Sequence, residues 1–385
     1  MDPALSQTGS TESMISEHDR DRLDELYGRL KQESGRFIGY PCNSVFDYSE
    51  LYRFLEFPLN NVGDPFADST YRVNTRDFER EVLSFFADLY RAPQDDYWGY
   101  MTSGGTEGNL YGLYLARELI PDGIVYYSED THYSVGKVLG VLGFRNIMIK
   151  RQENGEIDYE DLRETIRIHR DAPPVIFANI GTTMTGAVDS VATIRSILDE
   201  FALKRYYLHC DAALSGMILP FVKDPQAFTF EDGIDSISVS GHKMVGSPIP
   251  CGVVIAKKKN VDRIAQSVEY IGSLDTTIAG SRNGLSPLFL WYAIQKLGRT
   301  GFRDLVVGCL KMADYAIAAF REAGIEAWRN NNSVTVVFPR PADEVLKKWQ
   351  IAVFHDIGHI ITMPHIREAQ IDELVADIAG ARADS

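Results

Sequence analysis

Four short segments carry side chains that could perform chemistry, and the first of them could bind an anion. It reads TSGGTEGN, residues 102–109, and lies between an expected strand and an expected helix. Its small residues would let backbone N–H groups approach an anion, and the helix N-terminus would add a favourable dipole. The spacing matches neither GxGxxG nor the P-loop, which disfavours a nucleotide fold. An ordinary glycine turn would also explain the segment.

The second and third segments each place one polar side chain directly after an expected strand. In SEDTHYS, residues 128–134, His132 could stack on an aromatic cofactor, act as an acid or base, or be a hydrogen-bonded structural residue. In YYLHCDAALSG, residues 206–216, a buried strand leads into Asp211, and burying a carboxylate is costly unless it meets a cation. A protonated pyridine nitrogen would be such a cation, and the small alanines that follow leave space for its ring. The alternative role of Asp211 is a helix N-cap.

The fourth segment, SVSGHKMVGSPIPCG at residues 238–252, contains Lys243 in an apolar loop rich in Gly and Pro. Removal from water would lower the pKa of Lys243 and favour imine formation with an aldehyde. Ser240 and His242, which lie beside it, could donate hydrogen bonds to a phosphate. An exposed loop lysine is the alternative interpretation.

The order of these segments is that of fold-type I enzymes that use pyridoxal 5'-phosphate (PLP). From about residue 37 to the C-terminus the chain resembles the group II PLP-dependent amino-acid decarboxylases, and among them the bacterial histidine decarboxylases. The stretches that carry the resemblance are YYSEDTHYSVGK, FANIGTTMTGAVD, YYLHCDAALSGMILPFV and DSISVSGHKMVGSPIPCG.

The resemblance implies a carboxy-lyase that removes CO2 from a small L-amino acid, with conversion of L-histidine to histamine as the first hypothesis. The alternatives within PLP chemistry are L-serine decarboxylation to ethanolamine, decarboxylation of another amino acid, and an oxygen-consuming aldehyde synthase. A non-catalytic binding or scaffold protein is the alternative outside it. The intact Lys243, Asp211 and His132 argue against a scaffold.

Residue roles follow from the resemblance position by position. Lys243 is similar to the lysine that carries PLP as a Schiff base, Asp211 to the partner of the pyridine nitrogen, and His132 to the histidine stacked on the ring. The further matches are Ala213 on the opposite ring face, the phosphate ligands Gly105, Thr106, Ser240 and His242, the supporting pair Thr183 and Asp189, and Ser281 in GSRNG. This last segment resembles one that reaches the neighbouring subunit's cofactor, which implies a homodimer with active sites at the subunit interface.

In the segments expected around the substrate, the chain resembles two different groups of decarboxylases. LNNVGDPF, residues 59–66, and the tail at residues 345–364 are more similar to plant serine decarboxylases, whereas DAALSGMILPF is more similar to the histidine enzymes. Both groups usually have a histidine where this chain has Leu285, and the bacterial histidine enzymes tend to have a polar residue where it has Leu274. We therefore predict a pocket mouth formed by residues 60–66, with Asn60, Asn61 and Asp64, and by Leu274 and Leu285 from the neighbouring subunit.

A second group of titratable residues is expected to be structural. His355, His359 and His365 lie close together in HDIGHIITMPH, but the strong zinc motif needs Glu where Asp356 stands. A core or surface helix without a metal is expected here.

Lys243, Asp211 and His132 can meet only if the strands that precede them end near one another. Helical patterns, for example at residues 159–169 and 191–201, separate short apolar runs, which predicts crossovers and a mainly parallel sheet in an α/β large domain. The resemblance implies that this domain is aminotransferase-like. Further short strands near residues 333–338 and 360–363 predict a small C-terminal α+β domain. The expected strands of the large sheet are residues 97–102, 124–127, 147–150, 175–179, 206–210, 237–240 and 252–256.

The sequence predicts that the chain is organised in four parts. Residues 1–15 are predicted to be disordered, and residues 16–76 to form a helix capped by Ser16 and an irregular segment. Residues 77–284 form the PLP-binding large domain and residues 285–385 the small domain.

Composition disfavours several classes of protein. Lys and Arg number 39 against 54 Asp and Glu, a net charge of −15 without a basic run, which disfavours nucleic acid and anionic membranes as partners. No apolar run approaches the roughly 20 residues of a membrane span, and the N-terminus has no signal-peptide pattern. Four separated cysteines without a CxxC pair suit a reducing compartment. We therefore expect a cytoplasmic enzyme.

Overall fold

The computed structural model describes residues 15–68, 70–264, 266–268 and 273–383 of the 385-residue chain. The expectation of disorder for residues 1–15 falls almost entirely outside these ranges. In residues 266–268 and 273–275 the backbone elements are described and the side chains are not.

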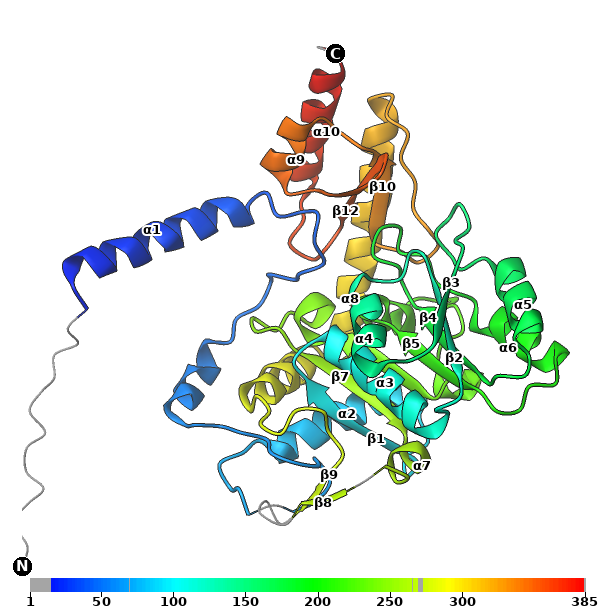
Figure 1. Cartoon of the computed structure of the whole chain (residues 1–385). Coiled ribbons are helices and arrows are strands. Elements are labelled where there is room, and N and C mark those ends of the chain that lie inside the picture. The colour runs from blue at the N-terminus through cyan, green and yellow to red at the C-terminus, as the bar shows by residue number, and fades with distance from the viewer. Residues whose placement is uncertain (1–14, 69, 265, 269–272, 384–385) are drawn as a thin grey trace, which may run out of the picture.

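A seven-stranded sheet forms the centre of the large domain (Figure 1). Its strand order is β1-β7-β6-β5-β4-β2-β3, and β7 runs antiparallel to both of its neighbours while the other adjacent pairs are parallel. The predicted, mainly parallel sheet is confirmed, and every predicted strand boundary lies within one residue of the observed one. The strands are β1 Tyr97–Thr102, β2 Ile124–Ser128, β3 Asn146–Ile149, β4 Pro174–Asn179, β5 Tyr207–Asp211, β6 Ser236–Ser240 and β7 Gly252–Lys257.

Apolar residues on both faces of the strands explain why this sheet is buried. In β7, Val254 and Ala256 belong to one hydrophobic cluster, whereas Val253 and Ile255 belong to the other. Because successive side chains of a strand point to opposite faces, the sheet separates two apolar layers. The helices of this domain are α2 Arg76–Leu89, α3 Gly105–Leu119, α4 Ser134–Leu142, α5 Tyr159–Ile168, α6 Val191–Glu200 and α7 Lys258–Val261, with short turns η2 Ser215–Met217, η3 Leu219–Phe221, η4 Phe230–Asp232 and η5 Gly241–Val245.

The N-terminal part of the chain begins away from the sheet. Helix α1 (Glu17–Ser34) starts after Ser16, whose side chain accepts a hydrogen bond from the backbone N–H of Asp19, as predicted for an N-cap. No residue of α1 is buried, and Figure 1 shows this helix projecting from the body beside the small domain. The helix η1 (Ser49–Glu56) follows, and a two-stranded ribbon of β8 (Gln266–Val268) and β9 (Ser273–Asp275) lies near α7.

Helix α8 (Leu285–Glu322) runs from the large domain into the predicted small α+β domain, with a break at Gly298, whose φ is +56°. There it packs against α10 (Glu368–Ala383) and contacts the antiparallel sheet β10-β12-β11. The remaining elements of this domain are β10 Thr335–Pro339, α9 Asp343–Trp349, β11 Ala352–Phe354 and β12 Ile357–Ile361. No helix in the described part of the chain has the length and apolar character needed to cross a membrane.

The histidine-rich segment of the small domain is a β-hairpin, so the predicted helix is wrong. His355 lies in the turn between β11 and β12 with a φ of +52°, and His359 lies in β12. The segment is rich in β-branched residues, which favour strands when a neighbouring strand can pair with them. The four-residue spacing of these two histidines therefore does not bring their rings onto one helix face.

Candidate active site

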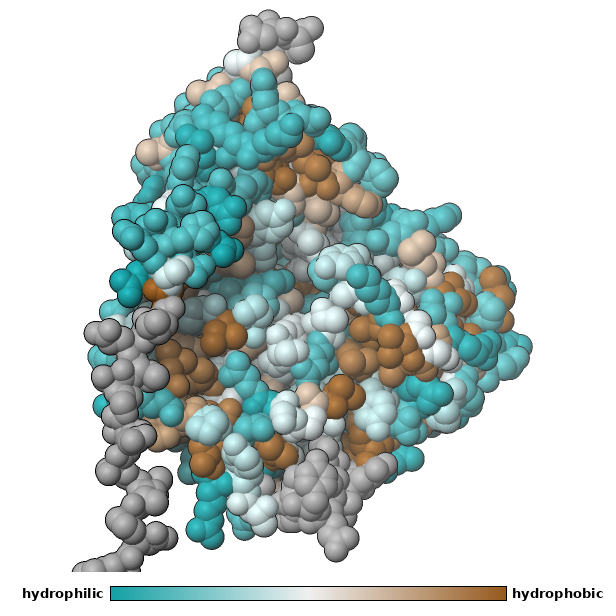
Figure 2. All heavy atoms as spheres, turned by 60° about the vertical axis from the view of Figure 1, so that its left-hand side comes forward, coloured by the Kyte–Doolittle hydropathy of each residue, from teal (hydrophilic) through white to brown (hydrophobic). Residues whose placement is uncertain are grey.

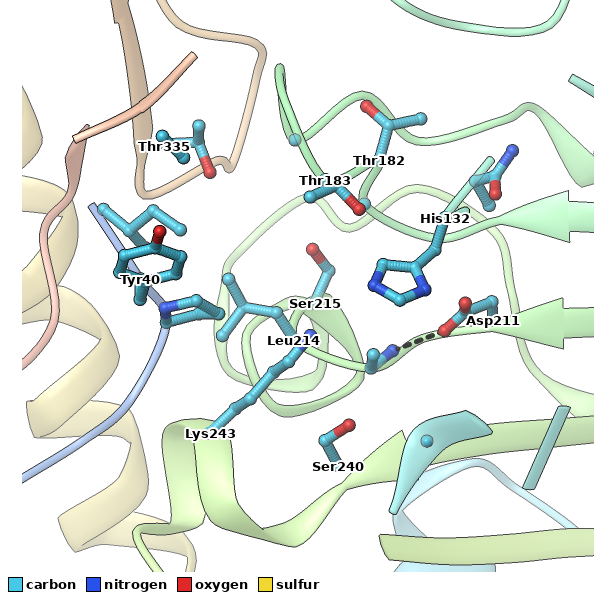
Figure 3. A pocket seen from close by; sticks show the side chains of 18 of the residues that line it. Tyr40, His132, Thr182, Thr183, Asp211, Leu214, Ser215, Ser240, Lys243 and Thr335 are labelled. Atoms are coloured by element: carbon cyan, nitrogen blue, oxygen red, sulfur yellow. Dashed lines mark hydrogen bonds between the residues drawn. The ribbon is translucent and has the colours of Figure 1, made fainter. Parts of the chain in front are cut away.

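A cavity of about 410 Å³ lies at the edge of the sheet where the parallel strands end. The strand ends and loops of the large domain form one wall. Figure 3 shows Lys243 pointing into the cavity between Asp211 and Tyr40. The opposite wall comes from the N-terminal segment and the small domain, and it consists of residues 39–41, 333–335, 352, 359 and 361.

Lys243 provides an amine in the cavity. It lies in η5, directly after β6, and its side chain extends toward the middle of the cavity (Figure 3). Burial lowers the pKa of Lys243, and the nearby Asp211 and Cys42 oppose that shift. A lowered pKa favours the neutral, nucleophilic amine. The backbone carbonyl of Lys243 accepts a hydrogen bond from the N–H of Asn43 at 3.1 Å, which ties the N-terminal segment to this loop.

Asp211 is the last residue of β5 and is 8 % exposed. Its Oδ2 accepts a hydrogen bond from Nδ2 of Asn109 at 2.8 Å. Its Oδ1 accepts one from the backbone N–H of Ala213 at 3.1 Å (Figure 3). Asp211 thus caps the following turn and also presents an oriented carboxylate to the cavity, so the two roles that the sequence left open are compatible.

His132 follows β2, and its ring stands beside Asp211 at the cavity (Figure 3). Its Nδ1 accepts a hydrogen bond from the backbone N–H of Ser134 at 3.3 Å and contacts the hydroxyl of the same residue at 2.7 Å. Burial lowers the pKa of His132 against the opposing charge of Asp211. A neutral ring held in this way can stack on a flat ligand.

The N-terminus of α3 and the loop after β6 form an end of the cavity that suits a phosphate. Gly105 and Thr106 lie in the first turn of α3, where backbone N–H groups have no partner within the helix. A Cβ atom at Gly105 would lie 2.8 Å from the Ser240 hydroxyl, so glycine permits this close approach. His242 contacts the carbonyl oxygen of Cys251 through Nδ1 at 2.9 Å and also lines the cavity.

The predicted polar residues of the substrate pocket lie outside this cavity. Asn61 is fully buried and donates a hydrogen bond to Glu79 at 2.7 Å, and Asp64 accepts one from an indole N–H. Asn60 donates to the hydroxyl of Ser281 at 3.1 Å, so this predicted cofactor contact is likewise away from the cavity. Within one chain these residues hold the segments around β1 together.

Only one of the two leucines of the predicted pocket mouth has a described side chain. Leu285 is the first residue of α8, does not line the cavity, and packs half-buried against the larger hydrophobic cluster. Leu274 lies in β9, and its side chain is outside the described part of the chain. A contribution from Leu285 to substrate recognition would have to reach the cavity of a second subunit.

The sequence and the fold are similar to those of known decarboxylases. Residues 74–339 match the pyridoxal-dependent decarboxylase conserved domain. The chain is 51 % identical over 367 residues to a histidine decarboxylase of Morganella morganii, which covers 94 % of this chain and 97 % of that protein. It is 50 % identical over 368 residues to a histidine decarboxylase of Acinetobacter baumannii, covering 95 % and 96 %. The L-methionine decarboxylase from Streptomyces sp. 590 superimposes with a TM-score of 0.86 at 27 % identity, covering 96 % of each chain.

The chain belongs to the pyridoxal-dependent decarboxylase family. It is a carboxy-lyase with PLP as its cofactor. The cavity fits this group, since PLP carries a phosphate, a basic ring nitrogen and an aldehyde that reacts with amines. The first turn of α3 and the Ser240 hydroxyl, which has no hydrogen bond to the described residues, suit the phosphate. Asp211 suits the protonated nitrogen, and the Lys243 amine suits the aldehyde.

Of the pair Thr183 and Asp189, Thr183 lines the cavity of the decarboxylase and Asp189 does not. Asp189 is fully buried and accepts hydrogen bonds from the backbone N–H and side-chain amide of Asn179 at 2.7 and 3.0 Å. Burial raises the pKa of Asp189 to about 7. Because Asn179 lines the cavity, these hydrogen bonds connect Asp189 to the site.

Several residues that line the cavity were missed by sequence analysis. Asn109, Asn179 and Ser215 lie inside segments whose chemistry was recognised, so their position was a usable signal. Tyr40 and Thr335 had no such signal, and His359 was noted only as part of an expected structural group. They come from the N-terminal segment and the small domain, which reach the cavity only through the tertiary fold.

His359 joins three segments at the far wall. Its ring is 1 % exposed, with Nδ1 at 3.1 Å from the carbonyl oxygen of Met184 and Nε2 at 3.1 Å from that of Gly39. Burial lowers the pKa of His359. The nearby His365 contacts the carbonyl oxygen of Phe37 through Nε2 at 3.2 Å, so these two histidines bind backbone. The described residues contain no cluster of three or more His, Cys, Asp or Glu arranged as a metal site.

Proposed function

We propose that this enzyme converts L-histidine to histamine and CO2. The observation that carries the proposal is the identity of about 50 % to proteins named histidine decarboxylase over nearly the whole chain. The methionine decarboxylase, which has the same fold, is only 27 % identical.

Nine of the predicted cofactor residues line the cavity and are proposed to hold PLP. Lys243 carries it covalently, Asp211 binds the ring nitrogen, and His132 and Ala213 contact the two ring faces. Bound PLP withdraws electrons from the Cα of an amino acid attached to it, which permits the loss of CO2. The remaining contacts are Gly105, Thr106, Ser240 and His242 at the phosphate and Thr183 beside the ring.

The walls around Lys243 suit the departure of a carboxylate. No arginine of the described chain lines the cavity, and Leu214 and Ile218 add apolar surface. An ion pair would stabilise the substrate carboxylate before reaction and not afterwards, which would raise the barrier. For returning a proton to Cα, the chain offers Lys243, His242 and the tyrosines at positions 40 and 133.

The imidazole of the substrate requires a polar partner on the opposite wall. Thr335 is 1 % exposed, and its hydroxyl has no hydrogen bond to the described residues. Figure 3 shows this side chain on the small-domain side of the cavity, across from Lys243. We assign Thr335 as the imidazole partner, a role that a hydroxyl can fill as donor or acceptor.

Substrate choice is tested by incubating the purified holoenzyme with each of the twenty L-amino acids. Released CO2 and the amine product are measured separately, and histamine is the expected main product. Ethanolamine from L-serine as the main product would establish the alternative activity. Oxygen uptake with release of ammonia would identify an aldehyde synthase.

The active enzyme is proposed to be a homodimer, and α1 is the best evidence for a second copy. Leu23, Leu26, Tyr27 and Leu30 recur at helical spacing on α1, and all are exposed. An exposed apolar stripe of this kind needs a partner surface. Figure 2 shows hydrophobic patches on the face that comes forward from the left of Figure 1, where the N-terminal segment lies.

Light scattering after gel filtration tests the dimer. Leu26→Glu should move the protein toward the mass of one 43.2 kDa chain, whereas Arg29→Glu, a change on the same helix outside the stripe, should not. A monomeric wild-type protein with full activity would exclude this assembly.

We also retain the proposed boundary between the large domain, residues 77–284, and the small domain, residues 285–385. Limited proteolysis near residue 285 should release both parts as compact fragments. The cytoplasm remains the proposed location, because all four cysteines are free. Activity in the soluble fraction of lysed cells, rather than in the medium or envelope, checks it.

A further inference from the structure

A continuous line of hydrogen-bonded side chains lies behind Asp211, on the side away from the cavity centre. Tyr207 donates to the Ser236 hydroxyl at 2.9 Å, and that hydroxyl lies 2.7 Å from Nδ1 of His209. Nε2 of His209 lies 3.0 Å from Oδ1 of Asn109, and Nδ2 of Asn109 donates to Oδ2 of Asp211 at 2.8 Å. Four hydrogen bonds therefore connect a buried phenol to the carboxylate.

The donors and acceptors of this line are consistent with only one arrangement. The carboxylate of Asp211 accepts, so Asn109 must turn its NH2 group toward it and its oxygen toward His209. That oxygen needs a donor, which places the proton of the His209 ring on Nε2 and leaves Nδ1 as an acceptor. The Ser236 hydroxyl then donates to Nδ1 and accepts from Tyr207. Every hydrogen bond thus points toward Asp211.

Burial keeps each member in the protonation state that this arrangement requires. Tyr207 is 2 % exposed and burial raises its pKa, so it remains a phenol that donates. His209 is fully buried, and burial lowers its pKa to about 3, so the ring remains neutral with one N–H. A neutral ring has one N–H, so His209 donates from one nitrogen and accepts at the other, as the arrangement requires.

Glycines in α3 allow the helix to approach the strands closely enough to form this contact. A Cβ atom at Gly112 would lie 2.2 Å from Nδ1 of His209, and one at Gly108 would lie 2.1 Å from the hydroxyl of Ser238. Asn109 lies between these glycines. Side chains at either position would separate α3 from β5 and β6, and the amide of Asn109 would no longer reach both His209 and Asp211.

We propose that Asn109 and His209 are positioning residues that hold Asp211 as an oriented carboxylate and thereby keep the PLP ring nitrogen protonated. The proposal rests on the proposed role of Asp211 as the partner of that nitrogen, and it does not depend on which amino acid is the substrate. The amide of Asn109 stabilises the charged carboxylate by a charge-assisted hydrogen bond. His209 polarises that amide from behind, and hydrogen bonds aligned in one direction strengthen one another.

The test measures the protonation of the ring nitrogen in the substrate-free holoenzyme. PLP labelled with 15N in its ring is bound to each variant, and the 15N chemical shift distinguishes a pyridinium from a neutral pyridine. Asn109→Leu, which keeps the approximate volume and removes the amide, should move the shift toward neutral pyridine. His209→Phe should move it less, and His209→Gln, which retains an N–H donor, should restore part of the wild-type shift.

Steady-state rates provide a second readout of the same variants. Asn109→Leu should lower kcat by about 10- to 100-fold, the range for losing one hydrogen bond to a charged group. His209→Phe should cause a smaller loss with little change in KM. The His365→Phe variant is the control, since His365 is a half-buried histidine that neither lines the cavity nor belongs to the line, and it should leave the 15N shift unchanged.

The Asp211→Asn variant distinguishes a wrong positioning role of Asn109 and His209 from a wrong role of Asp211 as the partner of the ring nitrogen. If Asp211→Asn keeps a protonated ring nitrogen, the role of Asp211 itself is wrong. If that variant loses the proton while Asn109→Leu and His209→Phe retain the wild-type 15N shift, the positioning role is wrong and the role of Asp211 stands. If Asn109→Leu does not fold, equal shifts in His209→Phe, His209→Gln and the wild type overturn the proposal by themselves.

Discussion

The two walls of the cavity are built in different ways. On the large-domain wall, Lys243 and His132 follow strands of one sheet, Asp211 ends another of its strands, and hydrogen bonds orient Asp211 and His132. The opposite wall is assembled from the two ends of the chain, with Tyr40 from the N-terminal segment and Thr335 from β10. The first wall carries the groups proposed to hold PLP, and the second, the proposed substrate wall, carries Thr335.

Hydrogen bonds to backbone hold the second wall together. The N–H of Ile361 donates to the carbonyl oxygen of Ile38 at 2.9 Å. The side-chain amide of Gln370 donates to the carbonyl oxygen of Gly35 at 2.8 Å. His359 adds the contact with Gly39. The N-terminal segment is therefore joined to the small domain, while Asn43 and His359 also tie this wall to large-domain loops at Lys243 and Met184.

The comparison predicts that changes in the large-domain wall abolish chemistry. Lys243→Ala should eliminate turnover, because Lys243 is the one lysine among the described residues that line the cavity and the cofactor would lose its covalent attachment. Borohydride reduction followed by mass spectrometry should find no PLP adduct, whereas Lys259→Ala, an exposed lysine in α7, should retain it. A reducible adduct in the Lys243→Ala protein would refute the assignment.

Asp211→Asn should cost several orders of magnitude in kcat and still allow PLP to bind. An amide cannot keep the ring nitrogen charged, although it can retain a hydrogen bond. Cofactor absorbance checks binding, and the rate with L-histidine checks chemistry. Near-normal activity would mean that Asp211 only caps the turn through Ala213.

Changes in the substrate wall should alter selectivity and leave the cofactor in place. Thr335→Val should lower kcat/KM for L-histidine by about 10- to 100-fold, because an unpaired imidazole nitrogen is costly to bury. Thr335→Ser retains a hydroxyl and should lose much less. Equal kcat/KM values for these two variants would remove Thr335 as the imidazole partner.

A smaller effect is expected from Leu285→His. If this residue reaches the neighbouring subunit's cavity, the new ring should raise kcat/KM for L-histidine relative to L-serine. The same substitution combined with Leu26→Glu, which is expected to separate the subunits, should not raise that ratio. An unchanged ratio in the intact dimer would confine substrate recognition to the wall that contains Thr335.

The smallest expected effect is on stability in acid. The pKa of His209 falls from an ordinary value of 6.5 to about 3 on burial, so the unfolded chain takes up a proton that the folded protein refuses. The stability that this residue contributes is complete above pH 6.5 and is lost as the pH falls toward 3. His209→Gln should therefore show a shallower decrease of Tm between pH 8 and pH 5. The exposed His18→Gln is the control, and parallel Tm curves for wild type and His209→Gln would contradict the prediction.

Most of the large-domain wall could be predicted from the sequence. The strand at residues 97–102 was predicted with its observed bounds, and Lys243, Asp211 and His132 were all placed after strands. Buried parallel strands leave a strong local signal, since each is a short apolar run that ends in a polar turn. Their carboxyl ends meet at one edge of the sheet, so order along the chain was sufficient to bring these residues together.

The hairpin around His355 and the line from Tyr207 to Asn109 could not be predicted in this way. An apolar run with histidines four residues apart suits a helix or a strand, and pairing of β12 with β10 and β11 decided the outcome. His209 looked like an ordinary buried strand residue, because its contact with Asn109 spans 100 positions in sequence.

The sequence by itself determined the family, the parallel sheet and which proposed cofactor residues lie at its strand ends, because local hydrophobic pattern and strand order carry that information. Tertiary structure decided which segments complete the cavity. Tyr40, Thr335 and His359 lie far from the PLP motifs in the chain, and only packing of the small domain and the N-terminal segment against the sheet brings them to the site. Such contacts depend on the shapes of distant surfaces, for which neighbouring residues in the sequence provide no signal.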